Sequence, residues 1–337
     1  MRTQKLALPV VISAACLAFS TSSMAATWKM ALGDTAGGTQ YELGKNFAEQ
    51  IEKRSNGKIT VDLFPNSQLG SEQDTLNNAS MGLLDLSIIA INNITPFSPT
   101  VGVMTLPYVI QGPEDAKILT QGEIGEQLTK NTIRDAGVRI LGWAYSGCRR
   151  LSNSSKPVSS PDDLEGLVIR VPKNEIMIAS YQAWGVNPNP MAWSETFTAL
   201  QQGVIDGQDN PYITIDAMKF YEVQDYITDS CYVFSLEPLV IGEGKFQSLS
   251  PEEKTIVLEA GQAATQHSYE YLQDTEDKIK KRLVEEEGIT IIEPDNNEKE
   301  WISQATSIWP DFYDSIGGKE KLDDVLKALG RDPAPEE

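Results

Sequence analysis

The chain has 337 residues, which is more than one hydrophobic core usually supports, so we expect two lobes. Its 48 acidic residues outnumber its 28 basic ones and give a net charge of −20. A field of this sign argues against nucleic acids and anionic lipids as partners, and only local positive charge could hold a small anion against it. Solubility is otherwise a sufficient reason for the acidity.

Residues 1–25 have the composition of a secretory signal peptide. A positive segment precedes the apolar residues 6–19, and small residues occupy the positions that a signal peptidase reads before the cut. We expect cleavage after Ala25 and export of the mature chain, because the apolar run is too short to span a membrane. Cys16 leaves a lipid-modified start open as an alternative, although Ser13 stands where such signals usually carry leucine.

Two cysteines, Cys148 and Cys231, remain beyond the leader. In an oxidising compartment they can form one disulfide, but the sequence leaves their pairing open. With the single His267 they make no recognisable metal-ligand spacing, so we expect no metal site and no cofactor. Residues 206–210 superficially suggest a calcium loop, yet they lack the alternating oxygen ligands and the final glutamate, so we interpret them as a turn.

The first part of the mature chain alternates strands with helices. A helix is expected at 41–54, where it stops at the turn residues 55–57. Strands are expected at 27–32 and 58–64 on either side of it, and further strands at 83–90 and 137–145. The strand, helix, strand order with short connections predicts a parallel sheet and an α/β fold.

From residue 147 the alternation restarts. The segment 160–163 has the chemistry of a helix start, with a capping serine, a proline and two acids. We expect a buried strand at 167–171 and a turn around Asn210; the remaining predicted elements are helices at 175–184 and 194–203 and returning strands at 231–234 and 239–241.

A helical pattern opens at 250–253 and continues to about residue 287. A helix of about 35 residues would be about 50 Å long, which exceeds one lobe, so we expect it to cross both; two helices joined by a kink are the alternative. The predicted division is lobe I at 26–146 and 236–275, lobe II at 147–235 and 276–330, and a polar tail at 331–337.

Arg170 is the most informative residue of the chain. It is the one charged member of the apolar run in DLEGLVIRVP, residues 163–172, so a buried guanidinium there needs a partner. Asn210 in the segment VIDGQDNP and the aromatic Trp193 come from separate segments nearby. An arginine, an amide and an aromatic side chain are what a site needs to hold a small organic anion.

No catalytic arrangement is apparent in the sequence. It lacks the nucleophile-elbow, zinc-protease, phosphate-loop and dinucleotide-binding motifs. We therefore expect a binding protein and no enzyme. A secreted lyase or hydrolase acting on an organic acid is the alternative from another class, and a ligand-sensing subunit of a membrane receptor is a third.

From Trp28 to about Lys321 the chain resembles the solute-binding proteins of tripartite ATP-independent periplasmic (TRAP) transporters, of the dicarboxylate-binding (DctP) family. The motifs that carry the resemblance follow one another in the same order behind a signal peptide: SNGKITV, FPNSQLG, LPY, GCRRLSN, DLEGLVIRVP, PMAWSETF, ALQQG and DGQDNP. The resemblance implies a two-lobed periplasmic binding protein, a Venus flytrap, with a long helix that spans both lobes. It also implies ion-gradient-driven uptake through a small and a large integral membrane subunit.

The resemblance also implies the site. Arg170 matches the arginine that pairs with the ligand carboxylate, and Arg149 matches a second ligand-contacting arginine, with its neighbour Arg150 as the other possible register. Asn210 matches an amide of the second lobe, and Trp193 an aromatic against the ligand. The other expected ligand-binding residues are Asp34, Thr39, Glu72, Asn93, Lys173 and Tyr212.

The chain departs from the sialic-acid-binding members at three positions. Ala90 and Asn93 stand where those carry a glutamate and an arginine, and Lys173 replaces an asparagine. We therefore expect the anion clamp without that sugar specificity. A hydroxy, keto or aromatic carboxylate fits the clamp, and a sulfonate does so too, because its oxygens also accept hydrogen bonds from a guanidinium.

Overall fold

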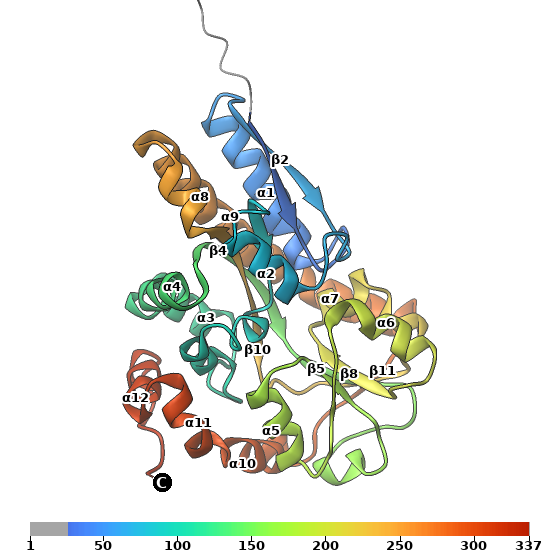
Figure 1. The fold of residues 1–337 in the computed structure, drawn as a ribbon. Helices are drawn as coiled ribbons and strands as arrows, with labels where there is room; N and C mark the ends of the chain where they lie inside the picture. The colour runs from blue at the N-terminus through green and yellow to red at the C-terminus, as the bar shows by residue number, and fades with distance from the viewer. Residues whose placement is uncertain (1–25, 337) are drawn as a thin grey trace, which may run out of the picture.

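The computed structural model describes residues 26–336, so the predicted leader and its cleavage site lie outside the described residues. The larger sheet has five strands in the order β2-β1-β3-β10-β4 (Figure 1). These are β1 (Ala26–Ala31), β2 (Ile59–Phe64), β3 (Leu86–Ile88), β4 (Val138–Cys148) and β10 (Phe234–Gly242). The predicted parallel arrangement holds for β1, β2 and β3, but β10 runs antiparallel between β3 and β4, so the sheet is mixed.

The first strand, helix and strand form as expected. Helix α1 (Thr39–Arg54) buries Leu43, Phe47 and Ile51 on one face, at the spacing of a helix that covers a sheet. It ends at Ser55, and Gly57 follows with a φ of 75°, a backbone conformation that suits glycine. Strand β2 then pairs with β1 in parallel register along its full length.

The second sheet has four strands in the order β11-β9-β5-β8. They are β5 (Arg150–Asn153), β8 (Gly207–Asn210), β9 (Tyr226–Thr228) and β11 (Thr290–Ile292). Asn210 therefore ends a strand paired to β5, and the prediction that it lies in a turn was wrong. The helices of this lobe are α5 (Glu175–Ala183), α6 (Trp193–Gln201) and α7 (Tyr212–Ala217).

The predicted strand around Arg170 is shorter than expected. Only Arg170 and Val171 form β6, which pairs in parallel with β7 (Asn189–Pro190), while Ile169 makes a single bridge to Gly207. Pro172 ends the strand directly, because proline has no backbone N–H for the next ladder hydrogen bond.

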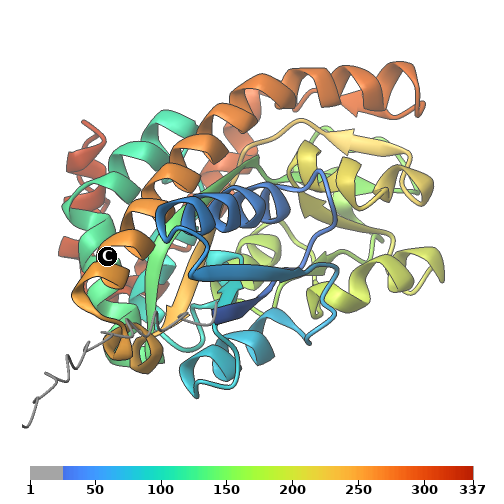
Figure 2. The ribbon, with the colours of Figure 1, turned by 90° about the horizontal axis from the view of Figure 1, so that it is seen from above.

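A single long helix, α9 (Pro251–Glu285), has 35 residues and runs along the whole molecule (Figure 2). Ser250 and Glu253 form a capping box at its start. It packs against α1 and β4 of the larger sheet and against α7 of the second lobe. The prediction of one helix across both lobes is confirmed, and the kinked alternative is not what forms. Within residues 26–336, no helix is long and apolar enough to cross a membrane.

The last two helices of the chain return to the first lobe, whereas the helix before them stays with the second. Helix α10 (Lys299–Thr306) packs against α5, as expected for residues assigned to lobe II. Helices α11 (Trp309–Ile316) and α12 (Lys319–Ala328) instead pack on the 3-10 segment η2 (Pro99–Thr105), which belongs to the first lobe. Only part of the predicted span 276–330 therefore lies with lobe II, because the apolar faces of these helices are buried in the first core.

A disulfide joins Cys148 and Cys231, which are 83 positions apart. Cys148 is the last residue of β4, and Cys231 lies between β9 and β10. Both segments run from one sheet to the other, so the bridge ties together two of the connections between the lobes.

Candidate functional site

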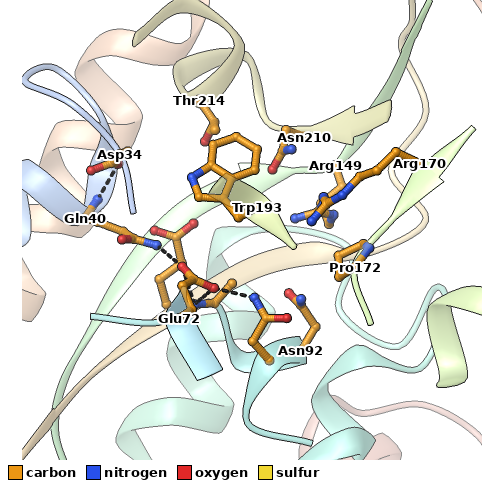
Figure 3. A pocket seen from close by; sticks show the side chains of 13 residues that line it. Asp34, Gln40, Glu72, Asn92, Arg149, Arg170, Pro172, Trp193, Asn210 and Thr214 are labelled. Atoms are coloured by element: carbon orange, nitrogen blue, oxygen red, sulfur yellow. Dashed lines mark hydrogen bonds between the residues drawn. The ribbon is translucent and has the colours of Figure 1, made fainter. Parts of the chain in front are cut away.

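A pocket lies between the two lobes (Figure 3). The larger-sheet lobe and the second lobe each contribute one wall. Its lining residues are Asp34, Gln40, Glu72, Ala90, Asn92, Asn93, Arg149, Arg170, Pro172, Trp193, Asn210, Thr214 and Glu237. Most of the residues expected from the sequence are therefore brought together.

Arg170 reaches this pocket from the short strand β6. The residue is 2% exposed, and its guanidinium donates through Nε (3.1 Å) and Nη2 (2.7 Å) to the backbone carbonyl oxygen of Met191. Among residues 26–336, no carboxylate oxygen lies within 4.0 Å of this guanidinium. Burial and the nearby charge of Arg149 lower the pKa of Arg170 to about 10, so it is charged at neutral pH. A buried cation is thus left without an acidic ion-pair partner among the described residues.

Arg149 lies beside it on the same wall. Its Nε donates to Asp209 Oδ2 at 2.8 Å, both side chains are buried, and the Tyr232 hydroxyl donates to the same carboxylate oxygen. Arg150 points away from the pocket, pairs with Asp229 and stacks on the Tyr212 ring. The register is therefore the one with Arg149 at the pocket, and Asp209 balances one of the two guanidinium charges.

Asn210 completes the second-lobe wall. It is the last residue of β8, and its side chain lines the pocket. Its amide donates to Gln208 Oε1, which fixes the side chain next to the two arginines.

Three carboxylates form the opposite wall. Asp34 accepts hydrogen bonds from the backbone N–H groups of Gln40 and Tyr41, each at 3.0 Å, at the start of α1. Glu72 is the first residue of α2 (Glu72–Ser80); it accepts from Gln40 Nε2 at 2.8 Å and from the Asn93 amide. These bonds from protein donors hold Asp34 and Glu72 in place in the wall of the pocket (Figure 3).

Glu237 is the third acid, and the sequence analysis missed it. It is 6% exposed on β10 and accepts hydrogen bonds from the hydroxyls of Ser146 (3.1 Å) and Thr39 (3.2 Å). Burial and the charge of Glu72 raise the pKa of Glu237 to about 7. Burial and the charge of Glu237 likewise raise the pKa of Asp34. The expected ligand residue Thr39 therefore lies one layer behind the pocket, where it holds Glu237.

Trp193 closes the pocket from the first turn of α6. Its indole Nε1 donates across the gap between the lobes to the carbonyl oxygen of Gly33 at 3.1 Å. A Cβ on Gly33 would lie 2.9 Å from the indole ring, so only glycine allows this approach. The hydroxyl of Thr35 also bridges the lobes, donating to the carbonyl oxygen of Ala217 at 2.8 Å.

Two further expected residues lie outside the pocket. Lys173 is exposed and lines a separate surface groove with Phe312, because Pro172 turns the chain outward after β6. Tyr212 is fully buried on the far side of the second sheet, where its ring centre lies 4.0 Å from the guanidinium carbon of Arg150.

The residues that sequence reasoning missed are mostly polar: Gln40, Asn92, Thr214 and Glu237, together with the pocket positions Ala90 and Pro172. Glu237 had a usable signal, because it is the lone charge in the apolar strand FSLEPLVIG, as Arg170 is in its own run. In the part of the chain that the structure describes, no group of three His, Cys, Asp or Glu side chains could hold a metal ion. The segment 206–210 is largely strand β8, so it forms neither the calcium loop nor the expected turn.

The fold and the pocket define a two-lobed binding protein that encloses a small solute between its lobes. Residues 33–315 match the family described as bacterial extracellular solute-binding protein, family 7 (DctP), and the chain belongs to this family. A solute-binding protein of Roseobacter denitrificans is 36% identical over 250 residues, which cover 74% of this chain and 76% of that protein.

Three solved structures of TRAP periplasmic or sugar-acid-binding proteins superpose on most of the chain. That of the Roseobacter denitrificans protein, with bound L-galactonate, gives a TM-score of 0.82 at 30% identity and covers 91% of this chain and 99% of its own. A sugar-acid-binding protein of Advenella mimigardefordensis in complex with galactonate gives 0.87 at 26% identity, covering 91% and 98%. An open, ligand-free protein of Rhodobacter sphaeroides gives 0.74 at 34% identity, covering 90% and 98%.

The chain is therefore an extracytoplasmic solute-binding protein of the TRAP type and not an enzyme. The hydrogen bonds from Trp193 and Thr35 join its two lobes across the gap.

Proposed function

We propose that this protein captures a sugar acid, a monocarboxylate that carries several hydroxyl groups. The observation that carries the proposal is Arg170, a buried guanidinium with no carboxylate of residues 26–336 within ion-pair distance. Leaving a charge in that state costs stability, so the site is built for an anion supplied from outside. The ligand carboxylate would lie between Arg170 and Arg149, whose forked donors suit a planar anion.

The acidic wall defines the rest of the ligand. Asp34, Glu72 and Glu237 offer acceptor oxygens that the hydroxyl groups of a sugar acid can satisfy. A second carboxylate on the ligand would be repelled by these groups, and a ligand without hydroxyls would add no hydrogen-bond donors to those that the protein already supplies. We therefore expect selection for hydroxylated monocarboxylates over dicarboxylates and over plain fatty or aromatic acids.

The ligands named for the similar Roseobacter and Advenella structures agree with this class. They are L-galactonate and galactonate, sugar acids with one carboxylate and several hydroxyl groups.

We further propose that the filled protein delivers its solute to the small and large membrane subunits of a TRAP transporter for ion-gradient-driven uptake. The family and the similar TRAP proteins support this role. The mature protein would act in the periplasm after cleavage behind Ala25. Mass determination of the exported protein would test that cut, and a mature chain starting elsewhere would correct it.

The experiment that tests the ligand class is calorimetric titration with a panel of aldonates and uronates. D-galactose serves as the neutral control and hexanoate as the control without hydroxyls. We expect at least one sugar acid to bind and neither control to do so. Binding of hexanoate as tightly as the sugar acids, or binding of D-galactose, would refute the proposal.

The role of Arg170 is tested in the same assay. Arg170→Ala should fold normally and lose about 100-fold or more in affinity, since two or more charge-assisted hydrogen bonds of about 1.5–3 kcal/mol each would be lost. Lys173→Ala is the matched control, because it removes a positive charge three positions away that lies outside the pocket. Equal affinities of the Arg170→Ala variant and the wild type would contradict the assignment.

A further inference from the structure

The disulfide lies next to the ligand site, and each of its cysteines directly precedes a residue that binds Asp209. Cys148 directly precedes Arg149, and Cys231 directly precedes Tyr232. The two residues that follow the cysteines meet at one carboxylate, because Arg149 Nε and the Tyr232 hydroxyl both donate to Asp209 Oδ2. The bridge thus sits at the base of the two side chains that hold Asp209.

The backbone repeats this pairing. The N–H of Arg149 donates to the carbonyl oxygen of Val233 at 2.8 Å, next to the bridge. Residue 149 lies between β4 and β5, and residues 229–233 lie between β9 and β10. The ladder pairs Cys148–Phe234 and Leu151–Thr228 flank this stretch. Between these pairs the disulfide and the hydrogen bond from Arg149 join the two connections and limit how far they can slide past each other.

The cluster has little tolerance for such a slide. Arg149 is 3% exposed, Asp209 is fully buried, and Oδ1 of Asp209 has no hydrogen-bond partner among the described residues. A shift of Arg149 relative to Tyr232 would leave the Asp209 carboxylate with still fewer donors in a buried position, which is costly. The arginine would then take another position, away from the one it has beside Arg170.

We propose that the Cys148–Cys231 disulfide is a positioning element of the ligand site, which holds Arg149 in register with Tyr232 on Asp209, so that opening the bridge weakens solute binding. The proposal rests on the proposed function in that Arg149 contacts the ligand anion. Both cysteines are partly exposed, so a thiol reductant can reach the bridge.

The alternative role of the bridge is general stabilisation by closing a long loop. That role predicts a lower melting temperature of the open protein with unchanged affinity, because loop closure acts on the unfolded chain. A positioning role predicts a loss of affinity that depends on Arg149. The two roles are separated by measuring binding under conditions where all variants are folded.

A first experiment needs no ligand. Hydrogen exchange is compared between the wild type and the Cys148→Ser/Cys231→Ser variant. We expect the Arg149 amide to exchange at least about tenfold faster in the variant, while amides of β1 keep their rates. Unchanged exchange at Arg149, or the same acceleration throughout both lobes, would overturn the proposal. If the serine variant fails to fold, wild-type protein reduced with dithiothreitol takes its place. The same protein after reoxidation is then the control with the bridge closed.

A second experiment is a double-mutant cycle with D-galactonate, or with the tightest sugar acid of the panel. Opening the bridge should weaken binding about tenfold in the wild type and in an Arg170→Lys background, but less than about twofold in an Arg149→Lys background. An equal loss of affinity in the Arg149→Lys and Arg170→Lys backgrounds would overturn the proposal. No loss in the wild type would also overturn it. If no sugar acid binds the wild type, the proposed function fails, while the exchange experiment still decides the role of the bridge.

Discussion

At the scale of single residues, the two walls of the pocket carry opposite charges of unequal number. One wall carries two guanidinium groups, of which Asp209 balances one, and the other wall carries three carboxylates. Such an arrangement is stable without ligand only if some acids hold protons, because like charges close together in a buried site disfavour ionisation. Burial and the charge of Glu72 accordingly raise the pKa of Glu237 to about 7.

This raised pKa predicts how the stability of the ligand-free protein depends on pH. The folded protein binds the Glu237 proton more tightly than the unfolded chain does, so the free energy of unfolding falls as pH rises from about 4.5 to 7. Glu237→Gln should remove a fall of about 2 kcal/mol and make the variant relatively more stable at pH 8 than at pH 5. Loss of the Glu237 charge also relieves Asp34, which acts in the same direction.

Urea unfolding of the wild type and the Glu237→Gln variant at pH 5 and pH 8 measures this effect. Glu49→Gln is the control, because Glu49 is exposed on α1 and lies nine positions after Gln40, the residue of this helix that lines the pocket. Parallel pH profiles for the wild type and the Glu237→Gln variant would show that Glu237 does not hold a proton in the folded state.

The residues of the site were predictable where one charge interrupts an apolar run. Arg170 was found in this way, and Glu237 could have been. Gln40, Asn92 and Thr214 could not, because polar residues in ordinary helices and loops look like surface residues until the lobes are placed against each other. Lys173 and Tyr212 lie outside the pocket for the same reason, since position in the chain does not say which face of a strand or turn meets the cleft.

At the scale of elements, the long helix α9, which packs against both lobes, makes a close contact with β4. A Cβ added at Gly261 of α9 would lie 2.0 Å from the carbonyl oxygen of Leu141, and one at Gly142 would lie 2.7 Å from the carbonyl oxygen of Gly261. The helix therefore rests directly on the backbone of the strand, with two glycines at the contact.

Alanine usually stabilises a helix relative to glycine, and this contact predicts the opposite at position 261. Gly261→Ala should lower the free energy of unfolding by about 1–3 kcal/mol or more, since the added methyl group has no room. Gly244→Ala in α8 (Glu243–Ser248), where a Cβ would meet nothing within 4 Å, should raise it by about 0.5–1 kcal/mol. Thermal or urea unfolding of both variants checks this, and stabilisation by Gly261→Ala would mean that the helix is not seated on β4 as described.

The hydrogen bond from Trp193 to Gly33 predicts a kinetic effect at the mouth of the pocket. Trp193→Phe keeps an aromatic ring but removes the donor, so the closed form loses one of its links and the ligand should dissociate about fivefold faster. Stopped-flow displacement with an excess of competing sugar acid measures the rate.

Trp301→Phe is the matched control for that measurement. Its indole also donates to a backbone carbonyl, that of Ser159 at 3.0 Å, but α10 and this segment share the second-lobe core. It should lower stability without changing dissociation. Equal dissociation rates for the Trp193→Phe variant and the wild type would contradict a closing role for Trp193.

Periodicity and stop signals predicted most elements, including α1, β2 and the long α9, because these features are local. The antiparallel insertion of β10 and the return of α11 and α12 to the first lobe were not predictable in this way. The pattern of an apolar strand or an amphipathic helix predicts that the element has a buried face, but it does not predict which other element covers that face.

At the scale of the whole molecule, the charge of the protein opposes the charge of its proposed ligand. The chain carries a net charge of −20, and the favourable interaction with an anion is confined to Arg149 and Arg170 inside a buried pocket. Approach from solvent therefore meets repulsion at long range and attraction only at the end.

This balance predicts that the association rate of a sugar acid rises with salt. Between about 10 and 150 mM sodium chloride the screening length falls from about 30 Å to about 8 Å, which removes the long-range repulsion but acts less on the buried arginines. We expect the association rate to increase about twofold, with dissociation nearly constant. Stopped-flow tryptophan fluorescence can follow the reaction, since Trp193 lines the pocket, and sucrose in place of salt controls for non-ionic effects. An association rate that falls with salt would mean that the two arginines, and not the net charge of the molecule, govern the encounter.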